Sequence, residues 1–373
     1  MMMVANLLLR LSFATTARRT SFLPGVPWPD TSGATIDAHG AGLLTVGDQT
    51  YWYGSQRHGH PNVPNGTHYP KYAAYCYPPP PPDAAAAAAA SHLGVLTHSV
   101  TLGDGYTEGV NLYVADGDLY NWKRIGLVFA ANETGAHCLE RPKVIQCPGS
   151  GKYVLWAKGF TPDGNVKAVV ATAETALGPF KLLDPAQPFY APANTSMADA
   201  TLYVEAGERG EKGVPWLFWR SRNQGFLAAR LQSDCTAIEA GVPPISVASK
   251  QHEAPAVFHY NRRAYLWTSA TSGFQANAAQ LLVSQSGSLA GPWVADGNPT
   301  KDSTTFDSQS TYVLRNPSFM SAEKTPTLPQ FLYLGDRWET KTTDFGRYVW
   351  LPLFIDETTG AVRVPNETSW HYG

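Results

Sequence analysis

Short apolar runs separated by turn residues recur along this chain, and their length and spacing are typical of β-strands. The first pair of runs covers residues 42–46 and 50–54, joined by the turn Gly47-Asp48. Four later pairs repeat this form: 144–147 with 153–156, 201–204 with 216–219, 256–260 with 264–267, and 311–314 with 331–334. The pattern therefore predicts five β-hairpins spread over most of the sequence.

A polar side chain stands at the head of the first strand in each hairpin. These residues are His39, Glu140, Asp199, Glu253 and Gln309. The last four follow one another at steps of 59, 54 and 56 residues. Such regular spacing predicts a repeat architecture in which one polar group per repeat reaches a common axis.

A second motif lies at the end of most of the repeats, where an aromatic residue follows a turn. These residues are Trp122, Phe180 and Trp293. Five repeats of about four strands each predict an all-β, single-domain, five-bladed β-propeller. A β-sandwich does not predict an even period. In a propeller the first strand of each blade lines the central channel, so the five polar heads should meet at one end of it.

We expect the propeller to span residues 31–373, after an N-terminal targeting or disordered segment at residues 1–30. Residues 77–92 combine a proline run with a run of alanines. This stretch has no apolar periodicity, and we interpret it as a low-complexity surface insertion in the first blade. No later stretch is long and apolar enough to span a bilayer.

Composition indicates an uncharged partner. Of the 373 residues only 16% are charged, and the formal net charge is −2, so the chain has no basic surface for nucleic acid. Aromatic residues reach 12%, and their rings can stack on sugars, although strand and core packing explain most of them. We expect a monomer.

The cysteines lack the spacing of a zinc site. Cys138 and Cys147 flank a strand start, so they could be bridged in an oxidising compartment, or both could be buried thiols. The sequence favours the secretory pathway or the extracellular space, because it has N-glycosylation sequons at Asn65, Asn132, Asn194 and Asn366.

Three of the polar heads are carboxylates, and glycosidic bond cleavage needs two carboxyl groups facing each other across a sugar-sized pocket. Glu253 precedes Ala-Pro-Ala, an apolar neighbourhood that would desolvate the carboxyl and raise its pKa, as a general acid requires. Alternatively, each carboxylate caps a strand or pairs with a neighbour such as Arg141 or Arg263. The shared phase across the repeats favours a common site.

Several phrases resemble glycoside hydrolase family 43, and within it the exo-β-1,3-galactanase branch. The resemblance runs in order over residues 36–353 and implies inverting, metal-independent cleavage of terminal galactose from β-1,3-galactan, the backbone of arabinogalactan-type glycans. The phrases are Ala38-His39-Gly40-Ala41-Gly42, Tyr51-Trp52-Tyr53-Gly54, Leu139-Glu140-Arg141-Pro142-Lys143-Val144, Glu253-Ala254-Pro255-Ala256, Ser308-Gln309-Ser310-Thr311-Tyr312-Val313, Gly335-Asp336-Arg337-Trp338 and Arg347-Tyr348-Val349-Trp350-Leu351-Pro352-Leu353.

By position, the resemblance implies that Glu253 is the general acid, that Glu140 holds the sugar and that Asp199 tunes the pKa of the acid. Gln309 matches a glutamine that is proposed to position or activate the water, but an amide oxygen is a poor base. Asp37, on the same strand face as His39, is therefore a rival base. No cofactor or metal ligand is expected, although a structural cation in the channel stays open. Expected sugar-binding residues are His39, Tyr53, Arg141, Ser272, Phe274, Asn277 and Arg337.

The chain departs from the branch in its sugar-recognition residues. Ser55 stands where the family has a glutamate, Phe274 replaces a tryptophan, and Asn165 replaces a tyrosine. Two alternatives to a galactan hydrolase therefore stay open. One is an arabinofuranosidase or xylosidase with the same fold and acid, and the other is a non-catalytic sugar-binding propeller.

Overall fold

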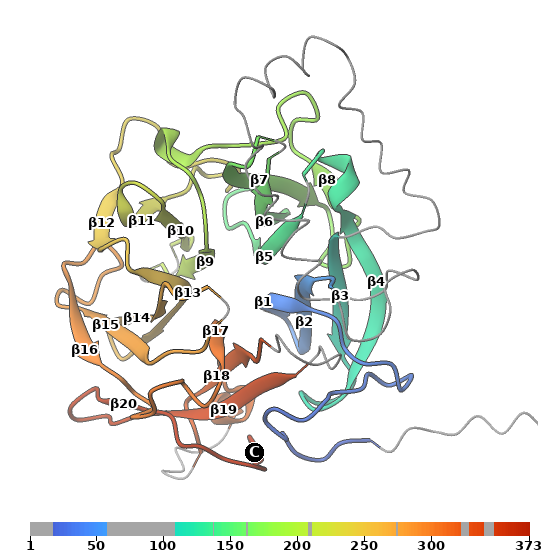
Figure 1. Cartoon of the computed structure of the whole chain (residues 1–373), viewed down its shortest axis with the longest axis vertical. Helices are drawn as coiled ribbons and strands as arrows, with labels where there is room; N and C mark the ends of the chain where they lie inside the picture. Colours follow the sequence, from blue (N-terminus) through green and yellow to red (C-terminus); the bar gives the residue numbers. More distant parts are fainter. Residues whose placement is uncertain are drawn as a thin grey trace, which may run out of the picture.

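The computed structural model describes residues 18–57, 109–136, 138–161, 163–207, 211–273, 275–321, 328–338 and 347–373. Five four-stranded antiparallel sheets stand around a central axis, as Figure 1 shows. The predicted five-bladed propeller is confirmed, and it is one domain. The predicted insertion at 77–92 lies outside the described residues.

Each blade uses four consecutive strands, and the first strand of each is the innermost. Blades 1 and 2 consist of β1 (His39–Val46), β2 (Gln49–Ser55), β3 (Gly109–Ala115) and β4 (Trp122–Ala130), then β5 (Leu139–Gln146), β6 (Tyr153–Phe160), β7 (Val166–Ala173) and β8 (Lys181–Leu182). Blade 3 consists of β9 (Ala200–Glu205), β10 (Val214–Ser221), β11 (Gly225–Arg230) and β12 (Ile245–Ala248).

Blades 4 and 5 complete the ring. They consist of β13 (His252–Tyr260), β14 (Arg263–Ala270), β15 (Ala279–Ser284) and β16 (Trp293–Gly297), then β17 (Gln309–Arg315), β18 (Phe331–Asp336), β19 (Tyr348–Ile355) and β20 (Val362–Arg363). In the part of the chain that the structure describes, the helical turns between strands are η1 (Ala131–Glu133), η2 (Pro192–Asn194) and α3 (Pro317–Ser321). None of the helices in the described residues is long and apolar enough to cross a membrane.

The inner strands β1, β5 and β13 begin earlier than their apolar runs predict, because each has a β-bulge near its head. The register shifts between His39 and Gly42, between Glu140 and Lys143, and between Glu253 and Ala256. One extra residue at each bulge bends the strand and re-aims the side chain at its head. His39, Glu140 and Glu253 were predicted to stand just before these strands. They belong to the strands themselves.

The same backbone conformation recurs at the three bulges. Gly40, Arg141 and Ala254 follow the polar heads and have φ angles of 59°, 49° and 55°. A left-handed conformation is uncommon for residues other than glycine, and such strain gathers at functional sites. Pro142 and Pro255 come next, where no ladder hydrogen bond is needed, so proline is tolerated inside these strands.

An aromatic seam, which we define by Phe22, Trp28, Trp52, Trp350 and Trp370, closes the ring between blades 1 and 5. All five side chains are buried in one core cluster. The two ends of the described chain meet here, because Phe22 pairs with Trp370 in a β-bridge. The boundary predicted at residue 30 therefore falls too late, since residues 18–30 belong to the propeller, whereas residues 1–17 lie outside the described part.

One disulfide joins blades 2 and 3. Cys147, just after β5, is bonded to Cys235 in the loop between β11 and β12. The predicted pairing of Cys138 with Cys147 is wrong, because Cys235 from the next blade reaches Cys147 across the ring. The alternative of two free thiols is also wrong, because no described cysteine is free.

Candidate active site

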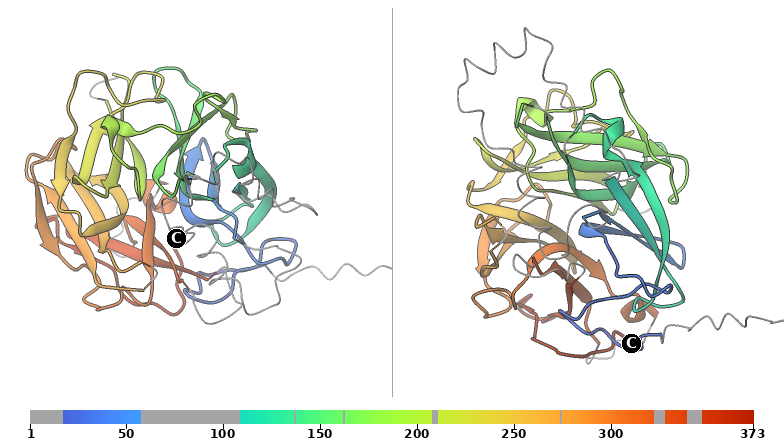
Figure 2. Two further views of the ribbon diagram at one scale, coloured as in Figure 1. Left: turned by 45° about the horizontal axis from the view of Figure 1, so that its top comes forward. Right: turned by 45° about the vertical axis from the view of Figure 1, so that its right-hand side comes forward.

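One pocket at the mouth of the central channel contains four of the five polar strand heads. Glu140, Asp199, Glu253 and Gln309 come from blades 2 to 5 and line it together. The inner strands pack against one another around the axis, which brings residues more than fifty positions apart in sequence to one place (Figure 2). The other described lining residues are Arg57, Arg141, Lys158, Gly273 and Trp338.

Glu140 is an ion-paired carboxylate. Its Oε1 accepts a hydrogen bond from Arg57 Nη2 at 3.1 Å, and its Oε2 accepts one from Lys158 Nζ at 2.9 Å. Lys158 stands opposite Glu140 in the β5–β6 register. Burial would raise the pKa of Glu140, but the charges of Lys158 and Arg57 outweigh burial and lower it. Glu140 is therefore ionised at neutral pH.

Asp199 is ionised for the same reason. Its Oδ2 lies 2.9 Å from Arg141 Nε, and its Oδ1 lies 3.6 Å from Lys158 Nζ. Burial would raise the pKa of Asp199, but Arg141 and Lys158 lower it below its usual value. Oδ2 also accepts from the backbone N–H of Ala254 at 3.1 Å. Asp199 thus holds the bulge that presents Glu253.

Glu253 differs from both, because none of the described cations makes an ion pair with it. Its Oε1 accepts a hydrogen bond from Gln309 Nε2 at 2.9 Å. Burial, and then the negative charge of Asp199, raise the pKa of Glu253 to about 7, against the pull of Arg141, Lys158 and Arg220. The pocket therefore contains two ionised carboxylates and one carboxylic acid that keeps its proton at mildly acidic pH.

A buried polar cluster lies deeper in the channel. The ring of His39 stacks on Tyr348, and its Nε2 and Nδ1 lie 3.6 Å from Asp37 Oδ1 and 3.8 Å from Asp336 Oδ2. Burial raises the pKa of Asp336 to about 6. Lys143 Nζ donates to the carbonyl oxygen of Gly40 at 2.6 Å. This cluster joins β1, β5 and β18 beneath the pocket.

Residues 100–351 match the family description "Glycosyl hydrolases family 43". The chain belongs to glycoside hydrolase family 43. Its place in the family implies hydrolysis of glycosidic bonds, which is the chemistry that paired carboxyl groups perform. No curated protein matches the sequence.

Solved structures of family 43 enzymes share the fold. A family 43 β-1,3-galactosidase has a TM-score of 0.69 at 26% identity, over 94% of this chain and 63% of that chain. A variant of the Phanerochaete chrysosporium exo-β-1,3-galactanase with β-1,3-galactotriose has a TM-score of 0.67 at 25% identity, over 95% and 69%. Another β-1,3-galactosidase, with galactodeoxynojirimycin, has a TM-score of 0.68 at 24% identity, over 94% and 100%. This family 43 chain thus spans less than two thirds of the first of these proteins.

The structure does not place all the predicted sugar-binding residues of this family 43 chain in the pocket. Tyr53 is buried in the core between blades 1 and 2, where its hydroxyl donates to the carbonyl oxygen of Ala176 at 2.5 Å. Arg337 points to another loop and donates to the carbonyl oxygens of Phe306 and Asp307. Arg141 lines the pocket, whereas His39 lies below it among the described residues.

The loop between β14 and β15 lies beside the pocket through Gly273. Ser272 and Asn277 hold this loop together, since Asn277 Nδ2 donates to Ser272 Oγ at 2.5 Å and to the carbonyl oxygen of Ala270 at 3.0 Å. Phe274, the other predicted contact here, lies outside the described residues. Sugar binding by Ser272 and Asn277 stays a prediction.

Asp37, the rival base, is engaged elsewhere. Its Oδ1 accepts a hydrogen bond from the backbone N–H of Arg57 at 2.8 Å, and the side chain does not line the described part of the pocket. Asp37 therefore fixes the backbone from which Arg57 reaches Glu140.

Two of the residues that depart from the exo-β-1,3-galactanase branch lie in different environments. Ser55 is buried in β2, and Asn165 is exposed in the β6–β7 loop.

Sequence reasoning missed three lining residues, Arg57, Lys158 and Trp338. Lys158 could have been found from register, because it is the cross-strand partner of Glu140. Trp338 belongs to the motif Gly335-Asp336-Arg337-Trp338, which resembles the family, but the motif alone does not indicate which residue the Trp338 side chain contacts. Arg57 follows Ser55 by two residues, and only the fold brings it to Glu140.

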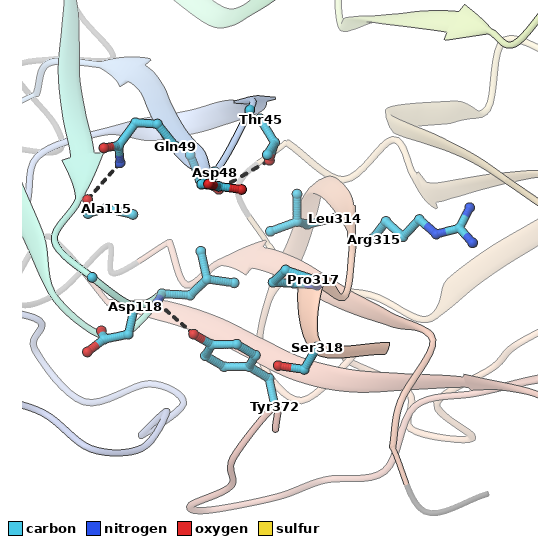
Figure 3. Close-up of a pocket in the computed structure, with 14 residues that line it drawn as sticks. Thr45, Asp48, Gln49, Ala115, Asp118, Leu314, Arg315, Pro317, Ser318 and Tyr372 are labelled. Atoms are coloured by element: carbon cyan, nitrogen blue, oxygen red, sulfur yellow. Dashed lines mark hydrogen bonds between the residues drawn. The ribbon is translucent and has the colours of Figure 1, made fainter. Parts of the chain in front are cut away.

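A second cleft, drawn in Figure 3, lies at the other ends of the blade 1 and blade 5 strands. Thr45, Asp48, Asp118, Arg315 and Tyr372 line it. Two aspartates stand on separate turns here, whereas the channel mouth has three carboxyl groups in one pocket. The channel mouth is therefore the better candidate for the catalytic chemistry of the family.

Within the described ranges, no three or more His, Cys, Asp or Glu side chains gather as donors for a metal ion. Lys143 places its amino group inside the channel, next to the carbonyl oxygen of Gly40, where burial and the charge of Arg141 lower its pKa well below the usual value. Independence from metals and cofactors stays a prediction.

Proposed function

We propose that this chain is an inverting, exo-acting glycoside hydrolase that releases terminal galactose from β-1,3-galactan. One observation carries the proposal: Glu253, whose pKa burial and Asp199 raise to about 7, stands beside two carboxylates, Glu140 and Asp199, that cations keep ionised. A general acid and fixed negative charges within one pocket are what glycosidic bond cleavage requires. Environments that push the pKa values of neighbouring carboxyl groups apart separate their roles.

In this mechanism Glu253 gives its proton to the glycosidic oxygen, which leaves with the electron pair of the C1–O bond. A water molecule attacks C1 from the opposite face of the sugar, which inverts the anomeric configuration. Positive charge develops on the ring in the transition state, and the fixed carboxylates Glu140 and Asp199 stabilise it. Asp199 also raises the pKa of Glu253, so it keeps the acid protonated.

The choice of sugar rests on the structural neighbours. Two neighbours with at least 25% identity are a β-1,3-galactosidase and an exo-β-1,3-galactanase with β-1,3-galactotriose. A neutral oligosaccharide suits a protein with a formal net charge of −2. We extend substrate and exo action from those proteins to this one as part of the proposal.

The test is hydrolysis of β-1,3-galactobiose and β-1,3-galactotriose by the purified protein, with the first-formed sugar observed by proton NMR. We expect galactose to appear first as the α-anomer, because a single displacement inverts the β-linkage. First appearance of the β-anomer would contradict inversion. Release of no sugar, from a protein that binds the same oligosaccharides, would favour the non-catalytic alternative.

A second candidate sugar follows from Ser55. The glutamate expected there from the family resemblance is missing, so the pocket lacks one carboxylate that would hold a galactose. Aryl α-arabinofuranosides and aryl β-xylosides should therefore be assayed beside aryl β-galactosides. Preference for either of the first two would replace galactan and keep the roles of the carboxyl groups.

We also infer that the protein enters the secretory pathway. The disulfide between Cys147 and Cys235 suits an oxidising compartment. Sequon residues Asn132, Asn194 and Asn366 are exposed, as acceptors of glycans must be. Glycosidase-sensitive mass on protein from a eukaryotic secretion host would support the inference, and its absence at all three sites would oppose it.

A further inference from the structure

The amide of Gln309 is held in one orientation by two groups that can only donate. Arg141 Nη2 lies 2.6 Å from Oε1 of Gln309, and Trp338 Nε1 lies 2.9 Å from the same atom. Guanidinium and indole N–H groups have no acceptor, so the atom that they share must be the carbonyl oxygen. The other end of the amide is therefore the NH₂ group.

This orientation makes Gln309 a donor to the acid. Its Nε2 lies 2.9 Å from Glu253 Oε1 and 3.3 Å from Ser269 Oγ. Since Nε2 donates, Glu253 Oε1 must accept, and a proton on Oε1 would face the N–H group. The proton of the neutral acid therefore resides on Oε2, the oxygen that is left to meet the substrate.

The same contacts leave Gln309 no basic site for water. A carbonyl oxygen has two lone pairs, and here both face a donor, one of them the charged guanidinium of Arg141. The side chain is also buried, with 6% of its surface exposed. A water proton has no lone pair on Oε1 to move to.

We propose that Gln309 acts on the general acid and not on the water: it is a positioning residue that keeps the proton of Glu253 on Oε2, and Trp338 orients it. This inference rests on the proposed glycosidase function. In the step concerned, the proton leaves Glu253 Oε2 for the glycosidic oxygen, which takes the electron pair of the breaking C1–O bond. The water oxygen bonds to C1 and releases its extra proton to solvent.

Trp338 has a second contact that allows its N–H group to be tested alone. The guanidinium carbon of Arg57 lies 4.4 Å from the centroid of the Trp338 ring, and Arg57 donates to Glu140. Trp338→Phe removes the N–H group and keeps an aromatic face for Arg57. Trp293→Phe is the matched control, because Trp293 on β16 donates its N–H to the carbonyl oxygen of Leu289, away from the pocket.

The test compares two leaving groups. Gln309→Ala should lower kcat/KM on β-1,3-galactobiose by about 10²-fold, at the low end of general acid catalysis, because the proton is no longer held on Oε2. Aryl β-galactosides with acidic phenols need less protonation, so their loss should be less than about 10-fold. A residue that activates water is needed for both substrates, so equal losses on both would overturn the proposal.

The pH profile provides the second readout. Asp199 faces Glu253 from just before β9, and Arg141, Lys158 and Arg220 face it from β5, β6 and β10; all four remain in the Gln309 variants. Loss of the Gln309 donor removes stabilisation of ionised Glu253, so the basic limb of kcat/KM should move to higher pH. An unmoved limb would count against a role on the acid.

Gln309→Glu separates the two roles further. A carboxylate would be a far better base than an amide, so a role on water predicts activity equal to or above that of the wild type. A role on the acid predicts low activity on β-1,3-galactobiose, because a second carboxyl then faces Glu253. Retained activity on both substrates would therefore overturn the proposal.

We call the loss of kcat/KM on β-1,3-galactobiose relative to the loss on aryl β-galactosides the leaving-group contrast. Trp338→Phe should change this contrast in the same direction as Gln309→Ala but by a smaller factor, since Arg141 still holds Oε1. Trp293→Phe should leave the contrast unchanged. If Trp338→Phe behaves like Trp293→Phe, Trp338 does not orient the amide. Failure of the proposed function looks different, because the wild type would then cleave none of these galactosides or Glu253→Gln would show no leaving-group contrast.

Discussion

The channel mouth and the aromatic seam are both buried between blades, but they are held together by opposite kinds of chemistry. At the mouth, Glu140 and Asp199 lie against cations in a pocket where a polar group without a partner would be costly. At the seam, Trp28 and Trp350 pack edge to face with ring centroids 4.9 Å apart. Aromatic packing there contributes stability without a role for charge. Substitutions at the mouth should therefore change activity, and substitutions at the seam should change stability.

The largest effect should come from Glu253→Gln. The amide keeps the shape of the side chain but has no acidic proton, so kcat on β-1,3-galactobiose should fall by ~10²–10⁴-fold. An aryl β-galactoside with an acidic phenol should lose much less. Steady-state kinetics on both substrates measure the loss of activity, and a thermal melt measures any loss of stability.

The control for that variant is Glu239→Gln, which changes an exposed glutamate. Its kinetics and melting temperature should match the wild type. Equal slowing of both substrates by Glu253→Gln would show that Glu253 is not the general acid, which would then have to be Glu140 or Asp199.

The seam should respond to Trp350→Ala. Trp350 is 2% exposed and contacts the rings of Trp28, Trp52 and Trp122. Truncation of a buried tryptophan costs about 3–5 kcal/mol, so the free energy of unfolding should fall by that amount. Denaturant unfolding measures the loss, and kcat per folded molecule should be close to that of the wild type.

Leu177→Ala provides the matched truncation of an apolar side chain. Leu177 is 49% exposed, so its loss should change the free energy of unfolding by less than about 0.5 kcal/mol. If both truncations lowered the free energy of unfolding by a similar amount, the aromatic seam would not be a main source of the stability of the propeller.

The disulfide between blades 2 and 3 should have a smaller effect than the seam. It closes a loop of 88 residues, and the joint change Cys147→Ser and Cys235→Ser should cost ~2–4 kcal/mol through the entropy of the unfolded chain. Chemical denaturation measures the cost. Catalytic constants that fall along with stability would show that this staple also shapes the channel mouth.

The smallest effect is a shift of the pH profile. Activity needs protonated Glu253, so kcat/KM should decline as pH rises through about 7. Asp199→Asn removes a negative charge that raises the pKa of Glu253, so the basic limb should move to lower pH. Kinetics on a natural and an aryl substrate over a pH series test this. A limb that stays in place would mean that Asp199 does not face the acid.

The hydrophobic pattern predicted the five hairpins and their propeller arrangement, and it placed the polar heads at the start of the inner strands. It missed the start of β5 and β13 because a bulge with Arg141 or Ala254 in the left-handed region interrupts the apolar run. It also kept residues 18–30 out of the fold, because Phe22 and Trp28 stand among polar and glycine residues. Their burial depends on Trp350 and Trp370, more than three hundred positions away.

By itself the sequence determined the β-propeller and the positions of Glu140, Asp199, Glu253 and Gln309, since strand period and repeat spacing are local properties. The sequence also predicted a raised pKa for Glu253 from its apolar neighbours, but only the tertiary structure decided that Glu140 and Asp199 stay ionised beside it. That outcome depends on Arg57, Lys158 and Arg141, which come from other parts of the chain and pair with Glu140 and Asp199 but not with Glu253. Charge at a site is set by burial and by neighbours in space, and the chain brings those neighbours together only when the ring closes.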